Sequence, residues 1–251
     1  MNAPDPRIVA RLQDLCIITF VIVSRRLQPG MSEHDIADAL RATMAEHGIT
    51  EHWYDVPFIV LIGGDRFVEG TLTSDYAVKA PSSHVKLSQG DAVHIDFSPM
   101  DPSTGAWGDW STTFVFDPAT PHHRDQLDFL EEMRALHGQG IAQITARTTG
   151  AQVAQYFMDE FAQRGVELVD VRRNVGHSIH IGPKSRSDRI WLDLANNSPL
   201  GPGIFTVEPG GIHRARNVVA RFEKCILIPE QGPATILGKD RAVPLMVKPG
   251  K

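Results

Sequence analysis

Residues 92–116 read AVHIDFSPMDPSTGAWGDWSTTFVF, and this stretch decides the fold. The β-branched and aromatic runs Ala92–Ser98 and Trp110–Phe116 predict two strands, and the Pro- and Gly-containing segment Asp101–Gly105 predicts the turn of a hairpin. Asp96 lies inside the first strand and Asp109 comes directly before the second. Acidic residues are rare in strands because a buried carboxylate loses its hydration. Both acids are therefore candidate functional residues.

The rest of the chain repeats one order of elements, with helices first and strands after them. In the first half, apolar spacing and caps predict helices over Arg7–Arg26 and from Ser32 to Gly48, then a strand over Val56–Ile62 and a loop-rich segment at 63–90. The second half predicts helices over His123–Arg147 and from Thr149 to Gly165, then strands at 166–171, 203–208 and 218–228. Helices followed by strands, twice over, favour an α+β fold.

The two halves also match residue by residue. Ser32, Ile36, Leu40 and Gly48 pair with Thr149, Val153, Phe157 and Gly165, always 117 positions apart. In the strands that follow, Asp96 pairs with Glu208 and Asp109 with Glu223. The two acids of the first half are 13 positions apart and the two acids of the second half are 15 positions apart. We therefore expect one domain over residues 1–251, with pseudo-twofold halves at about 7–117 and 123–228 and one active site between them.

Composition narrows the functional classes. Hydrophobic residues make up 42% of the 251 residues and charged residues 22%, as in an ordinary globular protein. Two cysteines, Cys16 and Cys225, exclude a disulfide scaffold and a cysteine-based zinc cluster. The net charge of −5 argues against nucleic acid as a partner, and the apolar run Leu15–Val23 is too short to span a membrane. With no targeting segment in sight, we expect a cytoplasmic protein with reduced thiols.

The four strand acids point to metal binding. Alternation along the strand places His94, Asp96 and Ser98 on one face, and four carboxylates in half-buried strands repel one another unless cations neutralise them. His177, in the segment Asn174–Gly182, is the best candidate for an added imidazole ligand. Carboxylates with one imidazole and no thiolate suit Mn²⁺, Co²⁺, Fe²⁺ or Zn²⁺ without deciding among them.

These motifs carry a resemblance. Asp96, Gly108-Asp109, Gly176-His177, Thr206–Gly210 and Arg221-Phe-Glu223 occur in the order typical of the creatinase/aminopeptidase, or pita-bread, metallopeptidase family, which includes methionine aminopeptidase, aminopeptidase P and prolidase. The resemblance runs from about residue 10 to 230 and implies a pita-bread fold with two divalent metal ions. It implies that Asp96 binds one ion, that His177 and Glu208 bind the other, and that Asp109 and Glu223 bridge them. Glu208 would also move a proton to the leaving amine.

Two departures from the family concern the substrate pocket. The family peptidases carry a histidine 17 or 18 residues before the first Asp, where this chain has Ala77-Val-Lys79. They carry a second histidine seven or eight residues after the ligand histidine, where this chain has no histidine. His84 and His180 are the nearest candidates to stabilise an oxyanion in their place.

The resemblance and its departures leave three functions open. The first is an aminopeptidase or dipeptidase of the Xaa-Pro type that cleaves small peptides with a metal-bridged hydroxide. The second is a hydrolase or lyase of a small non-peptide compound, which the altered histidines and the basic cluster Lys184, Arg186 and Arg189 support. The third is a binding module without catalysis. Trp53, Tyr54, Phe58 and Phe67 are expected to pack in the core, and a homodimer is compatible with the sequence.

Overall fold

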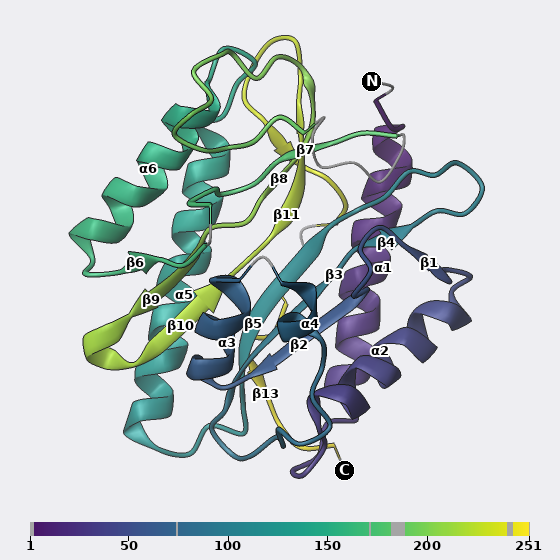
Figure 1. The fold of residues 1–251 in the computed structure, drawn as a ribbon, viewed down its shortest axis with the longest axis vertical. Coiled ribbons are helices and arrows are strands. Elements are labelled where there is room, and N and C mark those ends of the chain that lie inside the picture. Colours follow the sequence, from purple (N-terminus) through teal and green to yellow (C-terminus); the bar gives the residue numbers. More distant parts are fainter. Residues whose placement is uncertain (1–2, 74, 171, 182–188, 240–242, 251) are drawn as a thin grey trace.

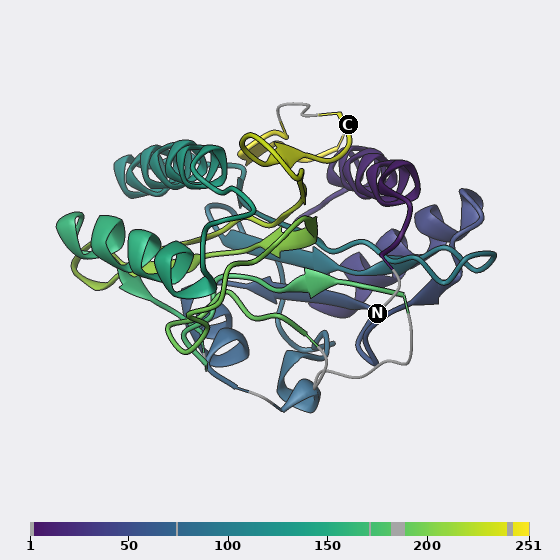
Figure 2. The same cartoon turned by 90° about the horizontal axis from the view of Figure 1, so that it is seen from above.

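The computed structural model describes residues 3–73, 75–170, 172–181, 189–239 and 243–250. Its elements run from helices to strands in each half of the chain (Figure 1). Figure 2 shows α1 and α5 on one face of the central strands with the C-terminal segment between them, and α3 and α4 on the opposite face. Among the described residues, no helix is long and apolar enough to cross a bilayer.

The first half begins with two capped helices. Asp5 caps α1 (Pro6–Ser24), and Ser32 with Asp35 forms a capping box at the start of α2 (Glu33–Glu46). The strands that follow are β1 (Glu51–His52), β2 (Phe58–Ile62), β3 (Ala92–Phe97), β4 (Pro99–Met100) and β5 (Trp110–Phe116). The predicted hairpin is confirmed, with β3 and β5 antiparallel and Asp96 opposite Ser111. Two short helices, α3 (Gly64–Thr71) and α4 (Tyr76–Lys79), occupy the segment expected to be rich in loops.

The second half repeats this plan. Its helices are α5 (Pro121–Ala142) and α6 (Gly150–Gln163), and α6 starts with a capping box between Thr149 and Gln152. Its strands are β6 (Glu167–Leu168), β7 (Ser178–Ile179), β8 (Gly203–Val207), β9 (Gly210–His213), β10 (Val218–Arg221) and β11 (Lys224–Ile228), with the 3-10 turn η1 (Arg214–Arg216) after β9. The long helix expected to reach Arg147 thus ends at Ala142.

The strand expected over 218–228 is two strands, and this correction matters for the site. β10 pairs with β9, whereas β11 pairs with β8, so the chain passes from one sheet to another at Phe222 and Glu223. Glu223 forms an isolated bridge with Ser111, which joins the two halves of the molecule. The break therefore places Glu223 where the two halves meet.

The sheets show the pseudo-twofold relation. One sheet has the order β13-β5-β3-β2 and the other β12-β11-β8-β7, so each strand has a counterpart at the same position. The edge strands β12 (Thr235–Ile236) and β13 (Met246–Val247) come from the Pro-containing tail. These two strands complete the sheets, and the side chains of Ala234, Leu245 and Val247 in the same tail are buried.

The core lies between the strands and the helix layer. Phe20 of α1 packs against Trp110 and Phe114 of β5, with ring centroids 5.7 and 5.4 Å apart. A second cluster joins α5 and α6 to β8, β10 and β11 through buried residues such as Phe157 and Phe205. Replacing a buried Phe of this kind by Ala typically costs about 3–5 kcal/mol of folding free energy. This packing fixes the strands that carry the acids.

Candidate metal centre

Three carboxylates converge at the junction of the two halves. Asp96 comes from β3, Asp109 precedes β5, and Glu223 sits between β10 and β11. One oxygen from each of them lies within 4.8 Å of one from each of the others. Asp109 is 3% exposed and Glu223 1% exposed. The β3–β5 hairpin and the break between β10 and β11 therefore bring together Asp96 and Glu223, which are 127 positions apart in the sequence.

Burial makes the charged forms of these acids costly. Loss of hydration raises the pKa of Asp96, and it raises the pKa values of Asp109 and Glu223 well above their usual range, with their mutual repulsion adding to the rise. Asp109 Oδ1 and Glu223 Oε1 are buried and accept no hydrogen bond from any residue that the structure describes. Buried oxygens without donors are the ligands that divalent cations take. The carboxylate oxygens of this cluster therefore fit divalent cations as ligands.

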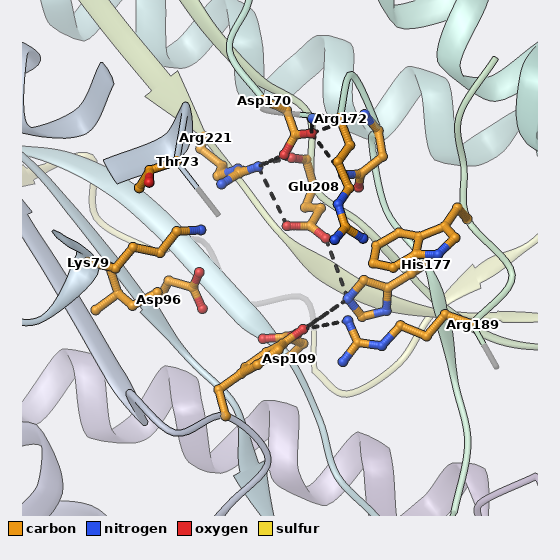
Figure 3. Close-up of a pocket in the computed structure, with 14 residues that line it drawn as sticks. Thr73, Lys79, Asp96, Asp109, Asp170, Arg172, His177, Arg189, Glu208 and Arg221 are labelled. Atoms are coloured by element: carbon orange, nitrogen blue, oxygen red, sulfur yellow. Dashed lines mark hydrogen bonds and ion pairs between the residues drawn. The ribbon is translucent and has the colours of Figure 1, made fainter. Parts of the chain in front are cut away.

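His177 and Glu208 flank this cluster. His177 Nε2 lies 3.8 Å from Asp109 Oδ2 and 3.6 Å from Glu208 Oε1 (Figure 3). Its Nδ1 is 3.1 Å from the carbonyl oxygen of Ser178, so Nδ1 donates there and the Nε2 lone pair faces the carboxylates. Metal-ligating histidines are usually oriented in this way.

A glycine allows this approach of His177. Gly176 has φ of +146°, and a Cβ there would collide with the carbonyl oxygen of Thr206. The backbone of His177 can therefore pair closely with β8: the N–H of Thr206 donates to the carbonyl oxygen of His177 at 2.7 Å, and Thr206 Oγ1 accepts from the N–H of His177 at 3.2 Å. A larger residue at 176 would push the imidazole away from the acids.

Arg221 holds Glu208 in place. Its Nε donates to the main-chain oxygen of Glu208 at 3.1 Å, and its Nη2 lies 3.7 Å from Glu208 Oε2 and 3.5 Å from Asp170 Oδ2. Burial raises the pKa of Glu208 to about 7, although Arg221 opposes the rise. The sequence reasoning missed Asp170, which also accepts from the main-chain N–H and side-chain amide of Asn174. Asp170 falls in the strand expected at 166–171, but the structure ends that strand at Leu168 and places Asp170 in the loop after it.

Tyr54 and Arg189 form the opposite wall. The Tyr54 hydroxyl is 3.2 Å from His177 Nε2 and accepts from Arg189 Nη1 at 2.9 Å. Arg189, the last residue of the basic cluster, is only 7% exposed and stacks over Trp107 and Trp191, at 5.3 and 5.5 Å from the ring centroids. Its Nε and Nη2 find no hydrogen-bond partner in the described part of the chain.

The structure tests the position of the other candidates. Lys79, where the family has a histidine, lines the same pocket as Asp96 and points toward it, opposite Arg189 (Figure 3). His84 is exposed and does not reach the pocket. His180 is buried against the edge of Trp53, with centroids 6.1 Å apart, and is absent from the described lining of the pocket. Lys184 and Arg186 lie outside the described residues.

The remaining candidates belong to the core. His94 packs edge-on against Phe67 at 5.3 Å, and its Nδ1 lies 3.3 Å from Thr113 Oγ1. Burial lowers the pKa of His94 well below its usual range, so this imidazole is neutral. Trp53 stacks on Trp107 at 4.4 Å, as expected for a core residue, whereas Tyr54 reaches into the pocket.

Comparisons with known proteins agree with this geometry. Residues 7–230 match the model of metallopeptidase family M24. The fold is similar to an X-Pro aminopeptidase from Thermotoga maritima (21% identity, 98% of this chain and 64% of that one, TM-score 0.74) and a dipeptidase from Mycobacterium ulcerans (20%, 99% and 62%, TM-score 0.74). The chain thus spans less than two thirds of those two proteins.

A methionine aminopeptidase from Thermotoga maritima is similar over most of both chains, with 16% identity, 91% of this chain, 94% of that one and a TM-score of 0.68. No curated protein matches the sequence. At these identities the structural likenesses establish the fold, which confirms the expected pita-bread architecture, and the match over 7–230 establishes the family. The chain belongs to metallopeptidase family M24.

Proposed function

We propose that the protein is a hydrolase of small Xaa-Pro peptides that holds two divalent ions between Asp96, Asp109, His177, Glu208 and Glu223. The observation that carries this proposal is the cluster of Asp96, Asp109 and Glu223, in which one oxygen from each lies within 4.8 Å of the others, and Asp109 Oδ1 and Glu223 Oε1 have no hydrogen-bond donor among the described residues. Asp109 and Glu223 are the most buried of the four acids, and both would hold the ions. Bound divalent ions would lower the pKa of a water and polarise a carbonyl.

Glu208 is the residue best placed to move a proton. In the metal-free protein burial raises its pKa to about 7, and its Oε1 lies 3.6 Å from His177 Nε2 at the edge of the cluster. Arg221 fixes its backbone, and the Thr206 hydroxyl lies 3.4 Å from its Oε1. The carboxylate would take a proton from the attacking water and deliver it to the leaving nitrogen.

Arg189 supports a substrate that ends in a carboxylate close to the centre. Its Nε and Nη2 are buried beside His177 without a hydrogen-bond partner among the residues that the structure describes, and a planar guanidinium binds a carboxylate through paired hydrogen bonds. When the scissile bond of a dipeptide lies at the metal centre, its terminal carboxylate is close enough to reach Arg189. The terminal carboxylate of a longer peptide lies too far away. The wall formed by Arg189 therefore favours dipeptides over longer chains.

The test is a comparison of three substrates on metal-loaded protein. Protein stripped with chelator and reloaded with Mn²⁺ or Co²⁺ is expected to bind two ions and to cleave Ala-Pro faster than Ala-Pro-amide or Ala-Pro-Ala. Cleavage should disappear in chelator and return on reloading. Two bound ions without cleavage of any peptide would contradict the peptidase proposal and favour a binding module. Failure to bind metal would contradict the whole proposal.

A second candidate function follows from Lys79. This cation lines the pocket beside Asp96, at the position where the family peptidases have a histidine, which favours a small non-peptide substrate that carries a carboxylate. Lys79→His decides between the two functions. If the protein is a peptidase, this variant should cleave Ala-Pro at least as well as the parent protein. A gain of peptide cleavage from an inactive parent would instead support the non-peptide function.

A further inference from the structure

A second cavity lies behind the carboxylate centre. It has a volume of about 270 Å³ and is lined by Trp110, Phe222 and Lys224 of the central strands. Phe222 and Lys224 flank Glu223 in the chain, and Trp110 follows Asp109, so alternation turns these side chains to the face opposite the acids. The C-terminal segment passes over this face between α1 and α5 (Figure 2).

The walls of this cavity are mostly apolar. Trp110 and Phe222 line it from the strands, and Leu245, Val243 and Ile236 of the C-terminal segment form its cover. A volume of about 270 Å³ lies just under the ~300 Å³ at which small-molecule pockets begin. A compact ligand with an aromatic body fits this space.

Gly138 of α5 leaves the cavity room on one side. A Cβ built on Gly138 would meet nothing within 4 Å, and the backbone there is helical without a positive φ. Glycine is unfavourable inside a helix because it gains no side-chain contact and loses more chain entropy than alanine. At position 138 its lack of a side chain keeps space open.

Two cationic side chains, Arg134 and Lys224, line the cavity beside the buried imidazole of His137, and no acidic residue lines it among the described residues. Arg134 Nη1 donates to the main-chain oxygen of Val243 at 3.1 Å, which uses one of its five N–H donors and holds the guanidinium at the cover. Asp128 and Glu131, earlier on α5, line a neighbouring groove that shares Arg134, Val243 and Leu245 with this cavity.

We propose that this cavity is a second binding site, for a small molecule with an aromatic or otherwise apolar body and one anionic group. The apolar body lies over Trp110 and Phe222, and the anion accepts hydrogen bonds from Arg134. The site is separate from the metal centre and does not depend on the proposed hydrolysis.

Calorimetric titration with 1-naphthoate and with its neutral analogue 1-naphthamide tests the site near neutral pH. The acid is expected to bind one molecule per chain, about tenfold more tightly than the amide, because it adds a charged hydrogen bond. Arg134→Gln should bring the affinity for the acid down to that for the amide, and Arg134→Lys should keep most of the difference.

Gly138→Leu fills the cavity from α5 and should weaken binding of both compounds at least about tenfold. Gly138→Ala is the matched control: it adds a single methyl group, favours the helix, and should leave both affinities unchanged. Equal binding of acid and amide, or parental binding by Gly138→Leu, would overturn the proposal. Loss of naphthoate binding in Arg189→Gln would also overturn it, since the acid would then lie in the metal centre.

Discussion

The side chain of Gln13 in α1 donates from Nε2 to the main-chain oxygen of Asp109 at 2.9 Å. Its Oε1 accepts from the main-chain N–H of Cys225 at 3.2 Å, so one amide joins the segment before β5 to the start of β11. Asp109 and Glu223, two of the acids proposed to hold the ions, lie on these two segments. Gln13 therefore sets the separation of the backbones that carry them.

We predict that Gln13→Leu weakens metal binding as well as the fold. The change leaves a buried carbonyl and a buried N–H without their amide partner, which costs about 2–4 kcal/mol of folding free energy. It also frees the two acid-bearing segments to move apart, so the Kd for Mn²⁺ should rise by about tenfold or more. Denaturant unfolding in chelator and metal titration by calorimetry measure the two effects separately.

Gln126 of α5 supplies the control. Its amide donates to the main-chain oxygen of Val219 at 2.7 Å and accepts from the N–H of Val219 at 3.1 Å, away from both of these acids. Gln126→Leu should lose a similar folding free energy with little change in the metal Kd. Equal weakening of metal binding in both variants would show that Gln13 acts through general stability alone.

The metal-free protein should lose stability as the pH rises. Burial raises the folded-state pKa of Glu208 to about 7, and also raises the pKa values of Asp96, Asp109 and Glu223 above those of the unfolded chain. The folded state then holds protons that the unfolded state has released, so unfolding free energy falls between about pH 4 and pH 7 and beyond. Each such proton contributes a slope of about 1.4 kcal/mol per pH unit.

Thermal melting in chelator across this pH range measures the slope. Saturating Mn²⁺ should reverse it, because metal binding needs the deprotonated carboxylates and strengthens with pH. A melting temperature in chelator that rises from pH 5 to pH 8 would contradict the prediction that desolvation of these four acids outweighs the cations near them.

Glu223→Gln should separate stability from metal binding in a single variant. Glu223 is 1% exposed, and its neutral amide removes a carboxylate whose charged form is costly to bury. We expect a higher melting temperature than the parent in chelator near pH 8, together with loss of metal binding and of hydrolysis. Parental metal content in Glu223→Gln would refute its role as a ligand.

The repeat predicted the architecture because strand acids and helix caps are local signals. Asp96 and Asp109 stand out in residues 92–116 from spacing alone, and the 117-residue offset gave the second half. The break at Phe222 and Glu223 was not predictable in this way, since the alternation of side chains runs through it without interruption. What breaks the strand is its change of partner from β9 to β8, which is a tertiary event.

The walls of the site were harder to predict than the acids. Arg189 and Asp170 come from irregular segments, where no periodicity tells a buried charge from a solvated one. Tyr54 belongs to an aromatic run, and only its contact with His177 distinguishes it from Trp53 beside it, which packs in the core. Counting from the family spacing leads to Lys79, which does line the pocket, whereas His84, the nearest histidine, is exposed and lies outside it.

His180→Ala tests whether this histidine acts in catalysis or in packing. A histidine that stabilises the oxyanion would lower kcat by about 10²–10³-fold on removal. The structure buries His180 against Trp53 and uses its main-chain oxygen to accept from Trp107 Nε1 at 2.9 Å. We therefore expect a loss of about 1–3 kcal/mol of stability and a kcat within a few-fold of the parent, measured on metal-loaded protein below its melting range.

If Arg189 binds the terminal carboxylate of the substrate, its replacement should affect only substrates that have this carboxylate. Arg189→Gln removes the Nε and Nη2 donors that would bind a terminal carboxylate and keeps a polar group beside Tyr54. KM for Ala-Pro should rise by about 10–100-fold, the value of a charged hydrogen bond or pair of them, while KM for Ala-Pro-amide should change little. Metal content should stay at the parental value, because Arg189 contacts Tyr54 and the aromatic wall rather than the carboxylates. An equal rise in KM for the acid and the amide would mean that Arg189 shapes the wall of the pocket without reading the carboxylate.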